Sequence, residues 1–257
     1  MALLKIEDVT KVYEGKVTHR ALNQLSFEVE HGEFLAIMGP SGSGKTTLLN
    51  VISTVDSLTG GSVQIGPTNP HQLSKNELAL FRRRELGFVF QDFGLLEMLT
   101  VEENLVLPLT LDNVPVDRMA KRVLEVAGKL NLTGILHKRP NEISGGEAQR
   151  TAIGRALIHE PSLILADEPT GNLDSKASRD VLELLSGASR ERGATIIMVT
   201  HDPVTASYCD RVLFIKDGEF FNEIYRDDRR QTFYQRVLNV LSLLGGNVND
   251  LSAIRLS

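Results

Sequence analysis

A glycine-rich segment at residues 39–47 carries the residue types that hold a chain of phosphates. Its sequence is GPSGSGKTT, which matches the pattern G-x4-G-K-[ST]. Glycines let the backbone wrap an anion with N–H groups pointing inward, and the dipole of a following helix adds attraction. Lys45 offers a cation to the β- and γ-phosphates, and Thr46 offers a hydroxyl to Mg²⁺. The predicted nucleotide-binding residues of this loop are Gly39, Ser41, Gly42, Ser43, Gly44, Lys45, Thr46 and Thr47.

The glycine spacing excludes a dinucleotide site. Gly42 and Gly44 form G-x-G, but the third required position is Thr47 rather than glycine. An ordinary glycine-rich turn is disfavoured because the full pattern lies between a predicted strand and a predicted helix, as a phosphate-binding loop requires.

Two adjacent carboxylates follow a second apolar run. The sequence LILADE at residues 163–168 reads as a buried strand that ends in Asp167 and Glu168. Ligands of open α/β sheets bind at the carboxyl ends of strands. Asp167 is therefore predicted to hold Mg²⁺, and Glu168 to polarise an attacking water. Solvated acids are common at strand ends, so the functional assignment of Asp167 and Glu168 depends on the presence of the phosphate-binding loop upstream.

Alternating strands and helices must position these groups. Strands are predicted at residues 3–12, 25–29, 34–38, 162–166, 195–200 and 211–216, and a helix follows the glycine-rich loop. This order predicts an α/β fold with a mostly parallel core sheet and an antiparallel β part. Asp217-Gly218 closes the last strand with a hairpin-type turn.

The middle of the chain is predicted to be a helical subdomain, inserted at about residues 92–148 of a nucleotide-binding domain that spans residues 1–225. Residues 116–130 favour an amphipathic helix. Its apolar stripe is predicted to comprise Val116, Met119, Ala120, Val123, Leu124 and Ala127.

A C-terminal helical tail is predicted for residues 226–257. Apolar residues repeat there at helical spacing and stop before Gly245-Gly246. They are Phe233, Val237, Val240, Leu241 and Leu244. The tail could pack on its own core or on a partner, and its own core is the favoured choice.

Composition bounds the function of this 257-residue chain. Hydrophobic residues make up 42%, enough for a sizeable core, and the net charge of −5 argues against nucleic-acid binding. The single cysteine, Cys209, cannot form an internal disulfide and is expected to be a small buried residue. The apolar runs are too short to span a bilayer, and Lys5, Glu7 and Asp8 interrupt any signal peptide. Any membrane role is therefore expected to come through a partner.

A third motif suggests a second subunit. Residues 143–150 read ISGGEAQR, which resembles the ABC signature L-S-G-G-Q with Ile143 and Glu147 at its first and last positions. Ser144 and two glycines at a helix start can form an anion cradle, or simply a helix cap. The cradle would be useful against a nucleotide held by another copy. The residues proposed for it are Ser144, Gly145, Gly146 and Glu147.

The whole set, over residues 3–225, resembles the nucleotide-binding domain of an ABC transporter. That resemblance implies adenine stacking by Tyr13, a Mg²⁺ or water contact by Gln91, a D-loop contact by Asp174 and a γ-phosphate contact by His201. The implied catalytic residues are Glu168, His201 and Lys45, and the implied Mg²⁺ ligands are Thr46, Gln91 and Asp167. The implied cofactors are ATP and Mg²⁺, and the implied partners are a second copy and a transmembrane permease. Through that permease the chain is implied to lie at the cytoplasmic face of the cell membrane. Residues 82–96 are expected to receive a coupling helix of the permease, and Arg82, Arg83 and Arg84 either serve that surface or form a solvated charge run.

Several segments resemble one branch of that family more closely. They are residues 34–39, 50–54, 87–94, 107–111 and 241–246, and they look like the bacitracin-type peptide-antibiotic resistance transporters of Gram-positive bacteria. The broader group includes lipoprotein-release, macrolide-efflux and cell-division ATPases. The branch implies a permease with a large extracellular domain and a sensor histidine kinase in the same complex.

Other roles remain open at this point. A mechanotransmission or lipoprotein-release ATPase would carry the same motifs. A soluble ABC ATPase that acts on ribosomes or DNA is disfavoured, because such chains usually have tandem domains or a long coiled-coil insertion.

Overall fold

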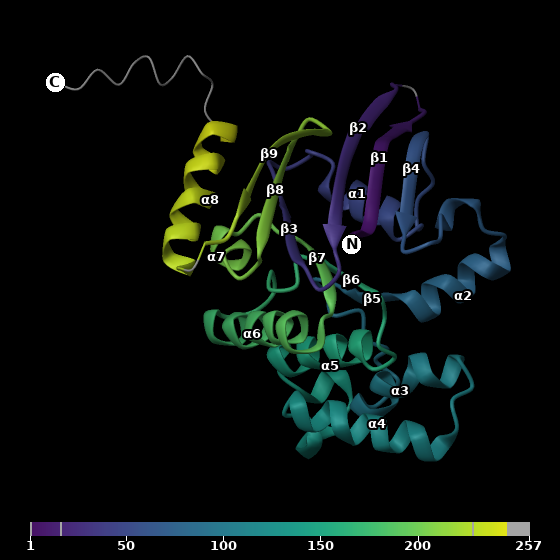
Figure 1. Ribbon diagram of the computed structural model, residues 1–257. Coiled ribbons are helices and arrows are strands. Elements are labelled where there is room, and N and C mark those ends of the chain that lie inside the picture. The colour runs from purple at the N-terminus through teal and green to yellow at the C-terminus, as the bar shows by residue number, and fades with distance from the viewer. Residues whose placement is uncertain (1, 16, 228, 246–257) are drawn as a thin grey trace.

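Two sheets form the frame of this computed structural model, which describes residues 2–15, 17–227 and 229–245. The smaller, antiparallel sheet has the order β2-β1-β4, with β1 at Ala2–Tyr13, β2 at His19–Glu30 and β4 at Gly60–Ile65 (Figure 1). The larger sheet has the order β5-β6-β7-β3-β8-β9. Its strands are β5 Leu86–Val89, β6 Leu163–Asp167, β7 Thr195–Val199, β3 Phe34–Met38, β8 Arg211–Lys216 and β9 Glu219–Tyr225.

Strands β5, β6, β7, β3 and β8 run parallel, and only β9 joins antiparallel, as a hairpin partner of β8. The hairpin turn has positive φ at Asp217 (52°) and Gly218 (80°), as a type I′ turn requires. The expected α/β fold with a mostly parallel sheet and an antiparallel part is confirmed.

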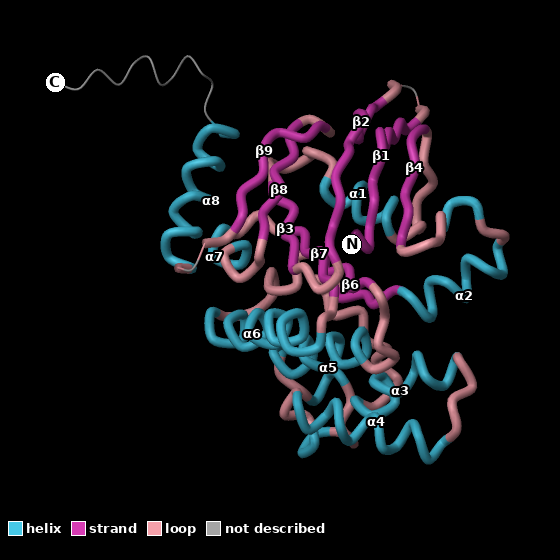
Figure 2. Tube along the Cα trace, in the orientation of Figure 1, coloured by secondary structure: helices cyan, strands magenta, loops and turns pink. Residues whose placement is uncertain are grey.

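Helices cover both faces of the large sheet and extend below it (Figure 2). They are α1 Lys45–Ile52, α2 Lys75–Glu85, α3 Val101–Leu111, α4 Val116–Lys129, α5 Gly145–Leu157, α6 Ser175–Arg192, α7 Pro203–Ala206 and α8 Arg230–Gly245. Short 3-10 turns occur at Pro70–Gln72, Thr133–Ile135 and Pro140–Glu142.

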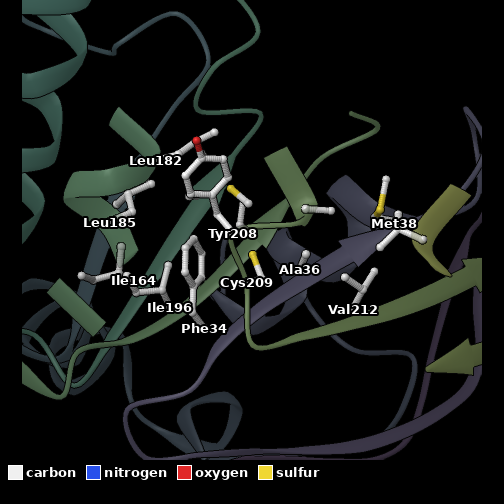
Figure 3. Packing of buried hydrophobic residues seen from close by; sticks show 14 of the residues in the cluster. Phe34, Ala36, Met38, Ile164, Leu182, Leu185, Ile196, Tyr208, Cys209 and Val212 are labelled. Atoms are coloured by element: carbon white, nitrogen blue, oxygen red, sulfur yellow. The ribbon is translucent and has the colours of Figure 1, made fainter. Parts of the chain in front are cut away.

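All five residues of the central strand β3 are apolar, which suits a strand that is buried on both faces. Phe34, Ala36 and Met38 join the cluster under α6 and α8, whereas Leu35 and Ile37 join the cluster around α1. Figure 3 shows the first cluster, where Phe34 lies near Ile196 and Cys209. Cys209 is fully buried, as expected of a structural cysteine, and burial raises the pKa of its thiol.

The helical insertion has a core of its own. Val101 and Leu105 of α3 pack there with Val123 and Val126 of α4. The predicted boundary at residue 148 falls inside α5, whose Ile153 joins the main core.

The predicted stripe of α4 is partly wrong. Val116, Ala120 and Leu124 are exposed, while Val123, Val126 and Ala127 are buried and Met119 is half-buried. The sequence pattern spread the apolar face too widely, because Val116 and Leu124 lie on the flank of the helix that faces away from α3 and α5.

Helix α8 packs on the protein's own core, as favoured. Its side chains Phe233, Val237, Val240 and Leu244 are buried in the same cluster as Phe34, and Leu241 packs against that cluster. Residues 246–257 of the predicted tail lie outside the described residues. Within the described part of the chain, no helix is both long enough and apolar enough to cross a bilayer.

Candidate active site

The phosphate-binding loop joins β3 to α1, and close packing explains its glycines. A Cβ at Gly39 would lie 2.1 Å from the carbonyl oxygen of Ile215, and a Cβ at Gly44 would lie 2.4 Å from that of Ala21. Gly44 also has φ 98° and serves as the N-cap of α1 without a side-chain hydrogen bond. The N–H groups of the first turn of α1 therefore point out of the helix toward the loop, where an anion can accept from them.

A cavity of about 230 Å³ lies beside this loop. It is lined by Tyr13, His19, Ala21, Gly42, Gly44, Lys45, Thr46 and Thr47. Ser41 is exposed at its edge of the loop, whereas Ser43 is buried and its Oγ has no hydrogen-bond partner in the described chain. An unpartnered buried hydroxyl in a glycine-rich loop fits a site that receives phosphate oxygens. His19 was not predicted, since no motif includes it.

Lys45 points into the loop. Its Nζ donates to the carbonyl oxygens of Gly39 at 2.9 Å and of Pro40 at 2.8 Å. Burial lowers the pKa of this ammonium, and the nearby charges of Glu168 and Asp167 act in the opposite direction. The predicted cation and the two predicted acids are thus brought to one place.

Asp167 ends β6 and is half-buried. Burial, and then the charge of Glu168, raise the pKa of its carboxyl. Among the described residues, no group of three or more His, Cys, Asp or Glu side chains could hold a metal ion. Magnesium commonly takes one or two carboxylates and completes its shell with water and substrate phosphates, so the oxygens of Asp167 and Thr46 fit that kind of site.

Glu168 is held in an unusual backbone conformation. Its φ is 45°, its N–H donates to Val199 O at 3.0 Å, and its Oε1 lies 2.7 Å from His201 Nδ1. A positive φ at a non-glycine residue is a feature that clusters at functional sites. The two predicted catalytic side chains are in direct contact.

Gln91 contacts the segment Asn172-Leu173-Asp174, which matches the D-loop of the resembled family. Its Nε2 donates to Asn172 Oδ1 at 3.4 Å, and Asn172 Nδ2 donates to Gln91 O at 3.0 Å. A Cβ at Gly171 would lie 2.9 Å from Gln91 Nε2, so a larger residue there would push the Gln91 side chain out of its present position. The Mg²⁺ contact of Gln91 remains a prediction.

Gln149 is a site residue that sequence reasoning missed. It is fully buried, and its Nε2 donates to Phe90 O at 3.2 Å and to Pro169 O at 2.5 Å. It ties the signature helix α5 both to the residue before Gln91 and to the residue after Glu168. The only signal was its place in the segment ISGGEAQR.

The signature residues start α5. Ser144 caps the helix by accepting from Glu147 N at 3.3 Å, and Glu147 accepts from Ser144 N at 2.7 Å, a capping box that lowers the pKa of Glu147. Gly146 packs closely on α6, since a Cβ at this position would lie 3.0 Å from Ala177 Cβ. Residues 144–147 do not line the cavity beside the phosphate-binding loop.

Asp174 accepts hydrogen bonds from backbone N–H groups of its own chain. It caps α6 by accepting from Lys176 N at 2.8 Å and Ala177 N at 2.9 Å, which lowers the pKa of its carboxyl. Its predicted contact with nucleotide remains a prediction.

An apolar groove of about 500 Å³ lies between α2, α3 and α5. It is lined by Ala79, Arg82, Arg83, Leu86, Gly87, Phe88, Phe90, Gly94, Leu107, Pro108, Leu111, Arg155, Ala156 and His159. Arg83 Nη1 donates to Leu111 O at 2.7 Å, and Arg84 Nε donates to Asp112 Oδ1 at 2.8 Å. Two of the three arginines therefore connect α2 to the end of α3, and they are not a purely solvated run.

The sequence model of the family described as "ABC transporter" matches residues 22–171, from β2 to the loop after Glu168. The chain belongs to the ABC transporter family. It is an ATP-binding, ATP-hydrolysing subunit of that family, and the parallel sheet with its phosphate-binding loop is the ABC ATPase fold.

Relatives cover the whole length of this ABC ATPase. It is 58% identical over 254 residues to the ABC transporter ATP-binding protein YxdL of Bacillus subtilis (strain 168), covering 99% of each chain. It is 48% identical over 252 residues to the bacitracin export ATP-binding protein BceA of Halalkalibacterium halodurans, covering 97% of this chain and 100% of the relative. Among solved structures it is similar to MJ0796 of Methanocaldococcus jannaschii in a dimeric post-hydrolysis state bound to ADP and Pi. That match has a TM-score of 0.79 and 40% identity, and covers 87% of this chain and 99% of MJ0796.

Proposed function

We propose that this ABC ATPase energises a separate permease that protects the cell against a bacitracin-like peptide antibiotic. The observation that carries the proposal is the 48% identity to a bacitracin export ATP-binding protein over that relative's full length. The macrolide export ATP-binding/permease protein MacB of Aggregatibacter actinomycetemcomitans is 40% identical over 224 residues, which cover 87% of this chain and 35% of MacB, and this similarity supports the broader group as the second candidate.

Two copies would close around two ATP molecules. In this proposal each ATP lies between the phosphate-binding loop of one copy and residues 144–146 of the other. Two observations support it. The signature residues do not line the cavity beside Lys45 in their own chain, and the relative MJ0796 forms a dimer bound to ADP and Pi.

Glu168 would act as the base that polarises the attacking water, with Lys45 and His201 balancing negative charge on the transferred phosphoryl group. Thr46 and Asp167 would hold Mg²⁺, joined by Gln91 after it leaves Asn172. Bound Mg²⁺ would neutralise charge on the β- and γ-phosphates. Asp174 would support the facing copy through the D-loop.

The apolar groove between α2 and α3 would receive a coupling helix of the permease and hold the ATPase at the cytoplasmic face of the membrane. Arg155 supports this role because it lines the groove and donates to Gly94 O at 2.7 Å and Phe93 O at 3.3 Å, the residues that follow Gln91. An occupant of the groove would therefore act on the Gln91 loop through Arg155. A sensor histidine kinase would join the complex through the permease.

The experiment is resistance in a bacitracin-sensitive Gram-positive host. The ATPase is expressed with the permease encoded beside it, and inhibitory concentrations of bacitracin and of a macrolide are measured. Bacitracin resistance that is lost with Lys45→Ala supports the proposal, whereas Lys75→Ala, on the exposed start of α2, is the matched control. Resistance to the macrolide alone, or no change with either drug, contradicts it.

A further inference from the structure

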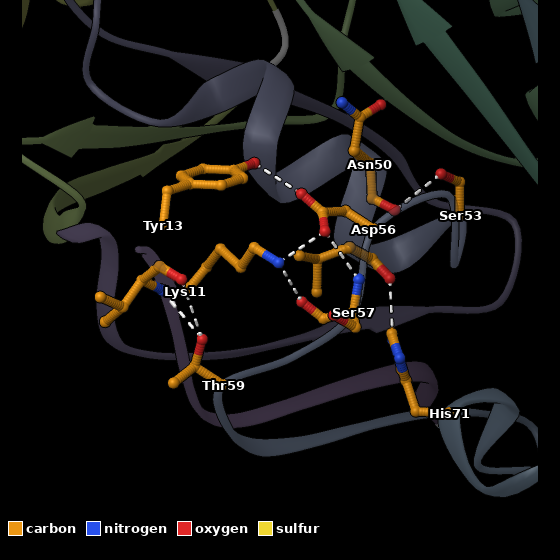
Figure 4. A network of polar contacts seen from close by, with 10 residues as sticks. Lys11, Tyr13, Asn50, Ser53, Asp56, Ser57, Thr59 and His71 are labelled. Atoms are coloured by element: carbon orange, nitrogen blue, oxygen red, sulfur yellow. Dashed lines mark hydrogen bonds and ion pairs between the residues drawn. The ribbon is translucent and has the colours of Figure 1, made fainter. Parts of the chain in front are cut away.

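Two side chains outside every motif hold the ring of Tyr13, at one end of the cavity beside the phosphate-binding loop (Figure 4). The Tyr13 hydroxyl donates to Asp56 Oδ2 at 2.6 Å. The Lys11 ammonium lies 4.9 Å from the centroid of the Tyr13 ring and donates to Asp56 Oδ1 at 2.5 Å. The three side chains thus form a closed triangle, and each contacts the other two.

The triangle is sheltered and its polar atoms are paired. The side chains of Lys11 and Asp56 are 8% and 25% exposed. Lys11 Nζ also donates to Ser57 O at 2.8 Å, and Asp56 Oδ1 accepts from Ser57 N at 2.8 Å. The hydrogen bonds from Lys11 and Tyr13 lower the pKa of Asp56, so the acceptor of the phenol is a carboxylate at neutral pH. Partly buried pairs with several hydrogen bonds have one favoured geometry, because any displacement leaves a desolvated charge unpaired.

The same triangle is tied to the helix that starts at the phosphate-binding loop. Asp56 N donates to Asn50 O of α1 at 3.1 Å. The segment 53–59, which follows α1 and carries Asp56, is also tied to β1, since Thr59 N donates to Thr10 O at 2.9 Å and Val12 N donates to Thr59 Oγ1 at 2.9 Å. The Tyr13 ring is therefore linked through Asp56 to α1, the helix that starts at the phosphate-binding loop, so connected elements hold both the ring and the loop.

Lys11 also defines which face of the ring can be used. The face of an aromatic ring is negative, and a cation within about 6 Å of its centroid is attracted to it. Because Lys11 covers one face of Tyr13, only the opposite face can take a base. Two π faces repel when stacked directly. A cation behind Tyr13 draws electron density away from the open face and reduces that repulsion.

We propose that Lys11 and Asp56 are positioning residues for the nucleotide base, holding the Tyr13 ring in the orientation in which it stacks on a purine. The inference rests on the proposed ATP-binding function and on the adenine stacking that the resemblance to ABC nucleotide-binding domains implies for Tyr13. It predicts that the triangle contributes to recognition of the base and leaves recognition of the phosphates unchanged.

The test compares two probes with the full-length protein, Mg-ATP and inorganic Mg-tripolyphosphate, which has phosphates but no base. Dissociation constants are measured by calorimetry.

Tyr13→Phe keeps the ring and the Lys11–Asp56 pair but removes the hydroxyl. Asp56→Ala removes the carboxylate that accepts from the hydroxyl. Each is expected to weaken ATP binding about fivefold or more, a fraction of the stacking contribution. The double variant is expected to bind ATP no more weakly than Asp56→Ala alone, because Asp56→Ala already breaks the contact that Tyr13→Phe removes. Tripolyphosphate binding is expected to stay unchanged and also shows that each variant is folded.

Tyr13→Ala and Glu7→Ala complete the set. Glu7 pairs with Lys5 at 3.1 Å on the same strand, so Glu7→Ala removes an ion pair outside the triangle and should leave both ligands unaffected. If Tyr13→Ala weakens ATP binding selectively while Tyr13→Phe and Asp56→Ala do not, the positioning role is overturned and the stacking role stands. If Tyr13→Ala has no effect, the stacking role and the inference both fail. Equal weakening of ATP and tripolyphosphate in Tyr13→Phe would show a purely structural contact and would also overturn the inference.

Discussion

His201 Nδ1 lies 2.7 Å from Glu168 Oε1. The two residues follow β6 and β7, neighbouring parallel strands whose carboxyl ends meet at one edge of the large sheet. The Glu168 side chain is 17% exposed, whereas that of His201 is 76% exposed. The glutamate is therefore fixed by the sheet, and the histidine is the partner that solvent, phosphate or a second copy can reach.

This contact predicts the behaviour of a histidine variant. His201→Ala should lower the turnover of ATP by at least ~10²-fold and leave the affinity for Mg-ATP nearly unchanged, because a donor to developing charge is lost while the loop that binds phosphate is intact. Phosphate release and equilibrium binding are the measurements. His201→Gln, whose amide can still donate a hydrogen bond, should recover part of the turnover. Normal turnover in His201→Ala would exclude a catalytic role.

The ionised carboxylate of Asp167 should lower the free energy of unfolding at neutral pH. Its pKa is raised above the ordinary value of 3.8, first by burial and then by Glu168. A carboxyl whose pKa is higher in the folded state stabilises the protein below its unfolded pKa, and this stability is lost as pH rises through the folded pKa. Asp167→Asn should therefore raise the free energy of unfolding at pH 7 in the absence of nucleotide, with no gain below pH 3.8, and should abolish hydrolysis.

Urea denaturation across that pH range measures the effect of Asp167→Asn. Asp174→Ala is the control of opposite sign, since the pKa of Asp174 is lowered by its helix-cap hydrogen bonds and its loss should destabilise the protein at pH 7. Lower stability of Asp167→Asn at pH 7 would refute the assignment.

Helix α8 should be part of the main folding unit. Phe233 is fully buried against the same cluster as Phe34, so Phe233→Ala should cost about 3–5 kcal/mol of unfolding free energy. Gln235→Ala, at an exposed position of the same helix, should change it by less than about 0.5 kcal/mol. A small cost for Phe233→Ala, or a separate unfolding transition for α8, would show that the helix is an independent tail.

The groove between α2 and α3 should determine association with the permease. Ala79 lines this groove from α2, and Ala79→Glu would place a charge against apolar Leu107 and Phe90. We expect Ala79→Glu to reduce co-purification with the permease at least about tenfold, as loss of a buried apolar contact at an interface centre does. Asn76→Glu adds the same charge to the same helix outside the groove and should leave co-purification unchanged. Equal recovery of both variants would remove the groove from the interface.

Site residues whose positions depend on neighbours close in the sequence were predictable from the sequence. The phosphate-binding loop, Asp167-Glu168 and the strands around them follow from short patterns, because the glycines, the helix start and the strand end are adjacent in sequence. The contact between Glu168 and His201 was not predicted as such, although each residue was placed in the site, and the parallel strands explain it by bringing their carboxyl ends to one edge.

Residues that act across the fold were not predictable. Asp56 reaches Tyr13 across 43 positions, and Gln149 reaches Phe90 across 59. A single carboxylate or amide in a loop or helix carries no spacing signal for such contacts. The stripe of α4 failed for a similar reason, because Val116 and Leu124 match helical periodicity while the neighbours that decide burial come from α3 and α5.

The most direct test of the two-copy site is sedimentation of Glu168→Gln with Mg-ATP. The account predicts a stable dimer that holds two ATP molecules, because binding is retained and hydrolysis cannot open it. It also predicts a monomer with bound ATP when Gly145→Glu is added, since a carboxylate at the start of α5 would face the γ-phosphate of the other copy. A Glu168→Gln protein that binds ATP and stays monomeric, or a dimer that persists with Gly145→Glu, would contradict the account.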